Sequence, residues 1–283
     1  GFRIVAAQIP FPIRSGDQVY DAVLARVSPK TKLAMISHIT SATSLIFPVE
    51  RIVPKLLERG IEVLVDGAHA PGQVEINIRA LNPTYYVGSG HKWLSAPKGT
   101  GFLYVHPSLH QGFRPVSLSS RAHKIRPERA LFLRDFDYVG TDDYTGILAM
   151  ADAIEYMGAL LPGGWPELIR RNHAVALKAR DIVCRALRCQ PPAPDDMIGC
   201  MATVLLPEAA EELQSRPTIY DDPLQDNLVA KHGIVVPIWR LTASNARVLR
   251  VSAQLYNSLD QYDHLARALI EELILERAFR IAA

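Results

Sequence analysis

The chain has 283 residues, enough for two compact domains, and its 48% hydrophobic and 21% charged residues are ordinary for a globular protein. Its 31 basic and 29 acidic residues leave a net charge of +2, which argues against nucleic acid or an anionic membrane surface as a partner. No apolar run is long enough to span a membrane, and the N-terminus lacks the pattern of a signal peptide. Cys184, Cys189 and Cys200 have no metal-like spacing, which favours reduced thiols in a cytoplasmic protein.

The first half of the chain predicts a parallel sheet. Residues 31–39 read as a buried strand, residues 48–60 have the periodicity of a helix ending at a glycine, and residues 61–72 form a short apolar strand running into a turn. A strand, a helix and a strand joined by such short connections indicate a right-handed βαβ unit. Residues 84–88 and 101–105 supply two more strands.

The second half predicts a smaller α+β region. We expect helices at 143–161, 165–189, 224–233 and 258–278, and strands at 201–207 and 247–253. The segment "LPGGWP", which separates the first two helices, reads as a hinge between domains. We therefore expect one domain over residues 1–160 and a second over residues 161–283.

The segment "YYVGSGHKWLSAPKGTGFLYV" (85–105) places a single lysine, Lys92, after a strand and a Gly-Ser-Gly turn. Small residues let the backbone come close to a ligand, and the hydroxyl of Ser89 and the imidazole of His91 are natural phosphate donors. A lysine at a fixed distance from an anchored anion is what Schiff-base chemistry needs. The alternative interpretation is a tight turn followed by a solvated lysine.

Two further candidates follow the strand that precedes this segment. Asp66 stands where the apolar run "IEVLV" ends, and His69 comes three residues later. Ligands bind outside the carboxyl ends of parallel strands, so a carboxylate there points towards a cleft. The alternatives are a turn aspartate and a hydrogen-bonded loop histidine. Together with Lys92, however, Asp66 would complete the set that pyridoxal phosphate requires: a lysine for its aldehyde, a carboxylate for its ring nitrogen and donors for its phosphate.

Four segments carry a resemblance to a known family: "VLVDGAHAPG", "GSGHKWLSAPKGTGFLYV", "VGTDDY" and "LRVSAQLYNSLDQYDHLARAL". In this order they resemble the class V aminotransferase family, and within it the isopenicillin N epimerase-like branch, from about residue 2 to about residue 275. The resemblance implies a pyridoxal-phosphate-dependent α/β protein of fold type I. Such a fold has a mostly parallel sheet with flanking helices and a smaller α+β C-terminal domain. We also expect that the N-terminal portion of the family's sequence is missing from this chain.

The resemblance assigns roles around the cofactor. Lys92 resembles the lysine that forms the Schiff base, and Asp66 resembles the carboxylate that keeps the pyridine nitrogen protonated. His69 falls where the family has a residue near the cofactor's phenolic oxygen. Ser89 and His91 resemble the phosphate ligands.

Three more positions are implied by the resemblance. Thr141 resembles the threonine that reaches the phosphate of the other subunit, which implies a homodimer with a shared active site. Ser41 takes the place of an asparagine that contacts the cofactor oxygen in the desulfurase branch. Arg250 resembles the arginine that binds the substrate's α-carboxylate.

The Arg250 assignment has support from the strand pattern. In an extended segment Val248, Arg250 and Ser252 share one face, while Leu249, Val251 and Ala253 form an apolar face on the other side. We therefore expect Arg250 to lie opposite the core, in solvent or in a cleft, where its guanidinium suits a carboxylate. Arg247 is a neighbour that could be confused with it.

The implied activity is pyridoxal-phosphate chemistry at the α-carbon of an amino acid or amino-acid-containing substrate, through Lys92. Epimerisation, transamination and elimination share these motifs. The segment before Arg250 has no cysteine, so the persulfide chemistry of the desulfurase branch is not expected. Two alternatives remain: a truncated, non-catalytic protein of the same fold, and a metal hydrolase that uses Asp66, His69 and His91.

Overall fold

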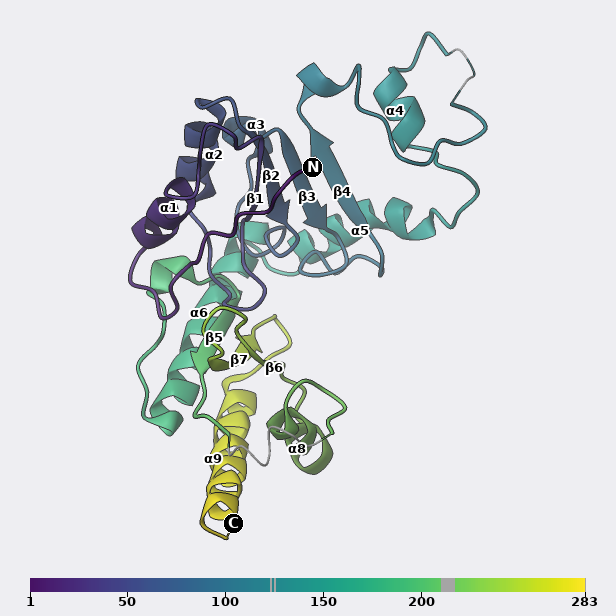
Figure 1. Cartoon of the computed structure of the whole chain (residues 1–283). Helices are drawn as coiled ribbons and strands as arrows, with labels where there is room; N and C mark the ends of the chain where they lie inside the picture. Colours follow the sequence, from purple (N-terminus) through teal and green to yellow (C-terminus); the bar gives the residue numbers. More distant parts are fainter. Residues whose placement is uncertain (123, 125, 210–216, 283) are drawn as a thin grey trace. The chain divides into compact units, whose positions relative to one another are not determined.

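The chain is described from a computed structural model that covers residues 1–122, 124, 126–209 and 217–282. It forms two compact units (Figure 1). The large-sheet unit comprises Pro29–His38 and Val49–Ala159, and the C-terminal unit comprises Gly1–Ser28, Ile39–Pro48 and Leu160–Ala283. Two N-terminal segments therefore group with the C-terminal residues. The domain ranges expected above stay a prediction.

The large-sheet unit contains a four-stranded sheet in the order β1-β2-β3-β4. Strands β1, β2 and β3 are parallel, and β4 is antiparallel to β3, so the predicted parallel βαβ unit is confirmed. The elements are β1 (Leu33–Ser37), α2 (Val49–Leu57), β2 (Glu62–Gly67), α3 (Ile78–Leu81), β3 (Tyr85–Ser89), β4 (Gly101–Val105), η1 (Pro107–Leu109), α4 (Leu131–Phe136) and α5 (Thr145–Ala159).

The two faces of this sheet differ in burial. Val63, Val65 and Tyr86 have no exposed surface, and they project from the face that also carries Ile36 of β1. The opposite face is open at the edge strand, because Leu33 is 54% and Met35 is 68% exposed. Parallel sheets normally have both faces covered, so this open apolar face is unusual.

The C-terminal unit contains a three-stranded antiparallel sheet in the order β5-β7-β6, and helix α6 packs against α9 and β5 (Figure 1). This confirms the predicted α+β character of the second half. The elements are α1 (Gly16–Leu24), α6 (Gly164–Leu187), η2 (Asp195–Met197), β5 (Met201–Leu205), α8 (Pro223–His232), β6 (Ile238–Arg240), β7 (Arg247–Ser252) and α9 (Leu259–Ala282).

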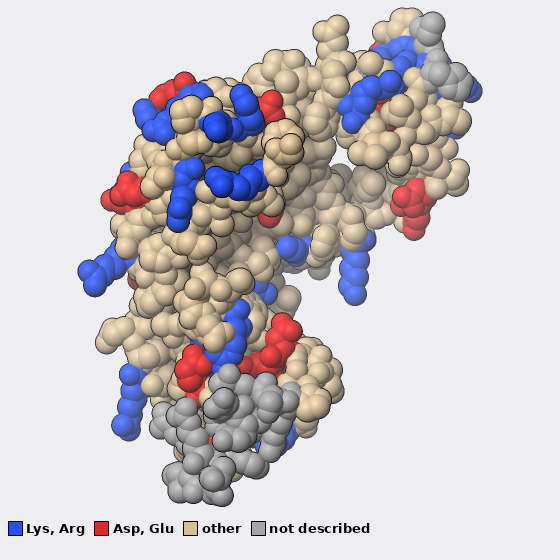
Figure 2. All heavy atoms as spheres, in the orientation of Figure 1, with Lys and Arg blue, Asp and Glu red and all other residues tan. Residues whose placement is uncertain are grey.

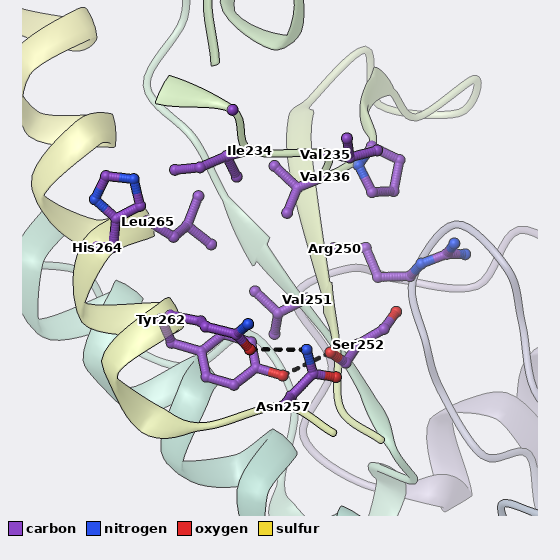
Figure 3. A pocket seen from close by; sticks show the side chains of 13 residues that line it. Ile234, Val235, Val236, Arg250, Val251, Ser252, Asn257, Tyr262, His264 and Leu265 are labelled. Carbon is purple, nitrogen blue, oxygen red and sulfur yellow. Dashed lines mark hydrogen bonds between the residues drawn. The ribbon is translucent and has the colours of Figure 1, made fainter. Parts of the chain in front are cut away.

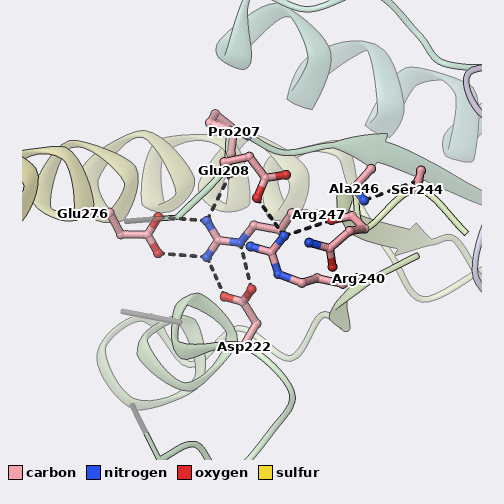
Figure 4. Close-up of polar contacts among 9 residues, drawn as sticks. Pro207, Glu208, Asp222, Arg240, Ser244, Ala246, Arg247 and Glu276 are labelled. Carbon is pink, nitrogen blue, oxygen red and sulfur yellow. Dashed lines mark hydrogen bonds and ion pairs between the residues drawn. The ribbon is translucent and has the colours of Figure 1, made fainter. Parts of the chain in front are cut away.

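A buried arginine joins three parts of the C-terminal unit (Figure 4). Arg247 of β7 has no exposed surface, and its guanidinium donates to both Asp222 and Glu276. Burial alone would lower the pKa of Arg247, but the hydrogen bonds and negative charges of Glu276 and Asp222 raise it above its usual value. Arg247 is therefore a structural cation that holds β7 to the start of α8 and to α9.

Basic and acidic side chains are both spread over the face drawn in Figure 2 and are separated by large uncharged areas, in line with the net charge of +2. Among the described residues, no helix is both long enough and apolar enough to cross a membrane.

Candidate active site

The first two candidates lie at the end of β2 and in the loop that follows it. Asp66 lies near the carboxyl end of β2 and is partly exposed, and its Oδ1 accepts a hydrogen bond from the Ala68 backbone amide over 2.9 Å. A backbone bond from Ala70 to Gly67 closes the turn, and His69 is partly exposed within it. Asp66 thus has the local turn role that was the alternative interpretation, and it also lies at the edge where ligands bind.

The turn after β3 is closed by one carbonyl. Thr100 O accepts hydrogen bonds from the Gly90 amide at 2.9 Å and from Nδ1 of His91 at 2.8 Å. Nδ1 of His91 therefore carries a proton. A side chain at Gly90 would not fit, because its Cβ would lie 2.8 Å from the Thr100 Oγ1. The closed turn fixes the backbone that leads from Ser89 to Lys92.

The two loops meet beside Lys92. Gly72 has a φ of +85°, and a Cβ there would lie 2.7 Å from the backbone oxygen of Trp93, so only glycine allows this approach. Lys92 directly precedes Trp93, and its Nζ lies 3.2 Å from Nε2 of His69. Two residues that are 23 positions apart in the chain thus form a direct amine–imidazole contact.

The direction of the hydrogen bond between Lys92 and His69 depends on which of the two side chains carries the proton. A charged lysine can only donate, so His69 accepts at Nε2 while Lys92 is protonated. When the lysine amine is neutral, the direction can reverse and Nε2–H of His69 can donate to Nζ. The pair can therefore pass a proton between the amine and the imidazole. The Lys92 side chain is exposed.

Five of the eight predicted site residues lie at the ends of β2 and β3 or on the loops that follow them in the large-sheet unit: Asp66, His69, Ser89, His91 and Lys92. Ser89 ends β3 on the same sheet face as Asp66. Thr141 belongs to the same unit but lies exposed between α4 and α5. Ser41 and Arg250 belong to the C-terminal unit.

Arg250 and Ser41 contact each other. Nη1 of Arg250 donates to the Ser41 carbonyl oxygen at 2.9 Å and to its Oγ at 3.2 Å. In the part of the chain that the structure describes, Nε of Arg250 is buried and meets no acceptor. Burial lowers the pKa of Arg250, whereas carboxylates raise that of Arg247. Arg250 is thus the arginine of β7 that is available to an anion.

The expectation for the faces of β7 was correct only in part. Leu249 and Val251 are buried as predicted, and Arg250 is partly buried on the opposite face. However, Val248 on the Arg250 face is fully buried too, and the apolar face includes the buried Arg247. The pattern could not reveal either feature, because both depend on elements far away in the sequence.

A pocket of about 320 Å³ lies next to Arg250 in the C-terminal unit (Figure 3). Its polar groups largely bind one another: Tyr262 Oη donates to the Ser252 carbonyl at 2.7 Å, and Asn257 Nδ2 donates to Gln261 at 3.0 Å. Figure 3 shows the guanidinium of Arg250 pointing away from these groups. The volume falls at the lower end of the usual range for small-molecule pockets.

The metal-hydrolase alternative is not supported. Among the described residues, the group of side chains close enough to share an ion is His232, Glu271 and Glu272, not Asp66, His69 and His91. Both oxygens of Glu272 already accept from the Lys231 ammonium, at 2.9 and 3.1 Å, so the carboxylate charge is already paired and is a poor ligand for a metal ion.

The cysteines lie within the C-terminal unit, and two of them are buried. Burial is the main cause that raises the pKa of both Cys184 and Cys200 to about 12. Thiols with such pKa values stay protonated at neutral pH and are poor nucleophiles. The two buried thiols are therefore unsuited to forming a persulfide.

Two contacts were not expected from the sequence. Trp239 of β6 lies next to Arg250, whose Cζ is 5.4 Å from the centre of the indole ring. Strand β6 has three residues, too few to show an alternating pattern. Nδ1 of His38 and Oη of Tyr86 are hydrogen-bonded to each other at 2.9 Å. The available signal for this contact was His38 itself, near the end of the strand predicted over residues 31–39.

The residues of the large-sheet unit fit pyridoxal phosphate. The fit rests on the donor set at one sheet edge: the exposed Lys92 amine beside the imidazole of His69, the Asp66 carboxylate, and Ser89 and His91 at the closed turn. These groups lie at the carboxyl edge of a mostly parallel sheet, as expected for the predicted pyridoxal-phosphate-dependent fold type I.

The sequence profile described as "Aminotransferase class-V" matches residues 7–174, and the chain belongs to the class V aminotransferase family. Pyridoxal phosphate is the cofactor of that family.

The chain is similar to curated relatives over most of its length. It is 32% identical to the isopenicillin N epimerase of Amycolatopsis lactamdurans, over 92% of this chain and 65% of that protein. It is 30% identical to the isopenicillin N epimerase of Streptomyces clavuligerus, over 89% of this chain and 63% of the relative. The probable chloroplastic L-cysteine desulfhydrase of Arabidopsis thaliana is 25% identical, over 95% of this chain and 58% of the relative. The chain thus spans less than two thirds of the length of these relatives.

Among solved structures, the chain is similar to the cysteine desulfurase CsdA of Escherichia coli, with a TM-score of 0.69 and 19% identity, over 91% of this chain and 63% of that structure. The cysteine desulfurase of Thermococcus onnurineus gives a TM-score of 0.68 at 19% identity, over 91% and 62%. These two similarities support the fold.

Proposed function

We propose that this chain acts as a pyridoxal-phosphate-dependent enzyme on the α-carbon of an amino acid or amino-acid-containing substrate, with isopenicillin N epimerase-like chemistry. The observation that carries the proposal is the contact of the Lys92 amine with His69, on loops that also hold Asp66. When bound, pyridoxal phosphate would withdraw electrons from a bond to the α-carbon.

In this proposal Lys92 would hold the cofactor through its aldehyde. With substrate bound, the Lys92 amine would take the α-proton onto Nζ. His69 accepts or returns a proton at Nε2, across the 3.2 Å contact. Asp66 carries the negative charge that keeps the ring nitrogen protonated, while Ser89 donates to the phosphate from its hydroxyl. His91, whose Nδ1 donates to Thr100, would donate to the phosphate from Nε2 with both ring nitrogens protonated.

Arg250 is proposed to bind the α-carboxylate of the substrate. A guanidinium can form two parallel hydrogen bonds to a carboxylate, and the described part of the chain gives Arg250 no carboxylate partner. Ser41 accepts from the same guanidinium, so a substrate would have to compete with Ser41 for Nη1. A contact of Ser41 with the cofactor oxygen remains a further proposal.

Epimerisation is the first candidate among the possible outcomes, because the two isopenicillin N epimerases are at least 30% identical to this chain. Elimination is the second candidate, favoured by the similarity to an L-cysteine desulfhydrase. Both reactions begin with loss of the α-proton, so the residues described here serve either one. Desulfuration would need a reactive thiol, and Cys184 and Cys200 are buried.

We also propose a homodimer in which Thr141 reaches the phosphate of the other subunit. Helix α5, which follows Thr141, supports a partner surface, because Ile147, Leu148 and Tyr156 are 53%, 74% and 68% exposed. Met157 is the buried residue of this apolar helix. Light scattering of the wild-type chain and of Leu148→Glu would test it: a dimer that the charge converts to a monomer is expected.

The function is tested first by adding pyridoxal phosphate and recording the visible spectrum before and after borohydride. A band that borohydride removes, with the cofactor fixed to Lys92 in a peptide digest, is the expected result. Amino acids are then screened by proton NMR in deuterated water, since exchange of the α-proton reports the first step of every candidate reaction. A protein without a cofactor band would support the non-catalytic alternative.

A further inference from the structure

Trp239 and Arg250 lie on the same face of the three-stranded sheet. Trp239 of β6 pairs with Val248 of β7, and Arg250 follows Val248 by two positions, so both side chains project to one side. The two are diagonal neighbours across the strands, and the guanidinium carbon of Arg250 lies 5.4 Å from the centre of the indole ring. At this separation the ring faces attract a cation.

The two side chains share a second property. Nε of Arg250 and Nε1 of Trp239 are both buried, and neither has a hydrogen-bond acceptor among the residues described. Both atoms can only donate. Leaving buried donors unsatisfied is unfavourable, so two of them side by side indicate a place where an acceptor binds.

The partners of Arg250 indicate which kind of hydrogen-bond acceptor would bind there. The guanidinium of Arg247, on the opposite face of β7, is satisfied by two carboxylates, whereas that of Arg250 is bonded to the uncharged oxygens of Ser41. A positive charge and an indole N–H together suit a group that is anionic and accepts several hydrogen bonds. A carboxylate has both properties, with lone pairs on two oxygens.

We propose that Trp239 is a second binding residue for the substrate carboxylate, and that its Nε1–H donates to the group that Arg250 binds. This inference rests on the proposed function, in which that group belongs to an amino acid. Trp239 thereby acts twice: its ring faces the guanidinium and shields it from water, and its N–H fixes the orientation of the carboxylate. Binding displaces the contact of Nη1 with Ser41.

The test records the indole N–H signals of the three tryptophans in a nitrogen-15-labelled chain. Trp239→Phe identifies the Trp239 signal by its loss. Sodium propionate is the probe, because it has a carboxylate but no amine to react with the cofactor; propionamide and sodium chloride are the controls. We expect propionate to move the Trp239 signal downfield to saturation, the controls to leave it in place, and Arg250→Lys to require more propionate.

Two results would overturn the inference. One is a Trp239 signal that does not move up to about 100 mM propionate, a concentration that covers very weak binding. The other is an equal shift with propionamide. The cofactor band is recorded on the same sample, so a Trp239 shift without a band would count against the proposed function alone, and a band without a shift would count against this inference alone.

Steady-state kinetics of two variants distinguish the contribution of the Trp239 N–H group from that of its aromatic ring. Trp239→Phe keeps an aromatic face next to Arg250 but lacks the donor, and Trp239→Leu lacks both. Loss of one hydrogen bond to a charged group should raise KM for an amino-acid substrate about tenfold in Trp239→Phe, with the cofactor band and kcat unchanged. A KM equal to that of wild type in Trp239→Phe, but raised in Trp239→Leu, would assign Trp239 a packing role only.

Discussion

Arg247 and Arg250 are three residues apart on β7, and they project to opposite faces with opposite surroundings. Arg247 is fully buried and held by Asp222 and Glu276 (Figure 4). Arg250 is bonded to Ser41 and has a buried Nε without an acceptor in the described structure. The first arrangement stabilises the fold, and the second retains a cation for a ligand.

This difference predicts opposite effects of the same substitution. Arg247→Met leaves two buried carboxylates without their cation and should lower the free energy of unfolding by about 3–5 kcal/mol. Arg250→Met removes a desolvated charge with no carboxylate partner and should change stability by less than about 1 kcal/mol, while substrate binding is lost. Urea unfolding and substrate titration of both variants check this. Equal destabilisation by the two changes would contradict it.

Lys92→Ala should abolish the cofactor band, because it removes the amine that contacts His69 and that is proposed to bind the cofactor aldehyde. Lys98→Ala is the matched control, since Lys98 is exposed in the same loop and should leave the band unchanged. Visible spectra with added pyridoxal phosphate provide the measurement. A band that survives in Lys92→Ala would show that a different lysine binds the aldehyde.

His69→Gln should keep the cofactor band and slow exchange of the substrate α-proton by about 100-fold or more, because an amide cannot relay a proton to Lys92. Exchange is followed by proton NMR in deuterated water. His106→Gln serves as the control, since His106 caps the short helix η1 by accepting from Ser108. An unchanged exchange rate in His69→Gln would limit His69 to a structural role.

Gly67→Ala should destabilise the large-sheet unit. An added Cβ would overlap the ring and hydroxyl of the fully buried Tyr86, and overpacking of this kind costs about 1–3 kcal/mol. Gly112→Ala is the control, because a Cβ at Gly112 meets no atom within 4 Å. Thermal unfolding of both variants gives the comparison, and similar midpoints for the two would refute the clash.

His38 should make stability depend on pH. Burial lowers the pKa of His38 from 6.5, with the charge of Glu50 opposing the shift. The unfolded chain therefore takes up a proton at this histidine more readily than the folded chain does. Stability from this group is present above pH 6.5 and falls as the pH drops through the lowered folded pKa, with a slope of at most about 1.4 kcal/mol per pH unit.

The matching variant is His38→Gln, which can still bond to Tyr86. Urea unfolding of wild type and variant at about pH 7.5 and about pH 5.5 should show a smaller loss of stability in the variant. Identical losses in the two proteins would mean that His38 is protonated in the folded state as well.

Local patterns predicted most of the strands and the long helices, but they missed α1 and β6. The helix expected over 48–60 forms as Val49–Leu57 despite Pro54 within it, since its buried apolar face dominates. Strand β6 was missed because three residues show no period. The direction of β4 was left open, because a short connection allows either direction until the pairing is known.

The candidate site was predictable where position along a strand decides it. Asp66 lies at the end of β2, and Lys92 follows the neighbouring parallel strand β3. Both residues therefore had to lie at the same edge of the sheet. The contact between Lys92 and His69 could not be predicted in the same way, since it depends on the close approach of Gly72 to Trp93. The pairing of Arg250 with Ser41 joins residues 209 positions apart, a separation that no local pattern covers.

The open face of the large sheet offers a chemical reporter. Met35 is 68% exposed, whereas Met157, Met197 and Met201 are 6%, 3% and 1% exposed, so dilute hydrogen peroxide should convert Met35 to its sulfoxide well before these three. Mass spectrometry of a tryptic digest then measures the fraction of Met35 that is oxidised. Any polypeptide or self-association that covers this face will protect Met35, and the degree of protection will report how much of the sample is covered.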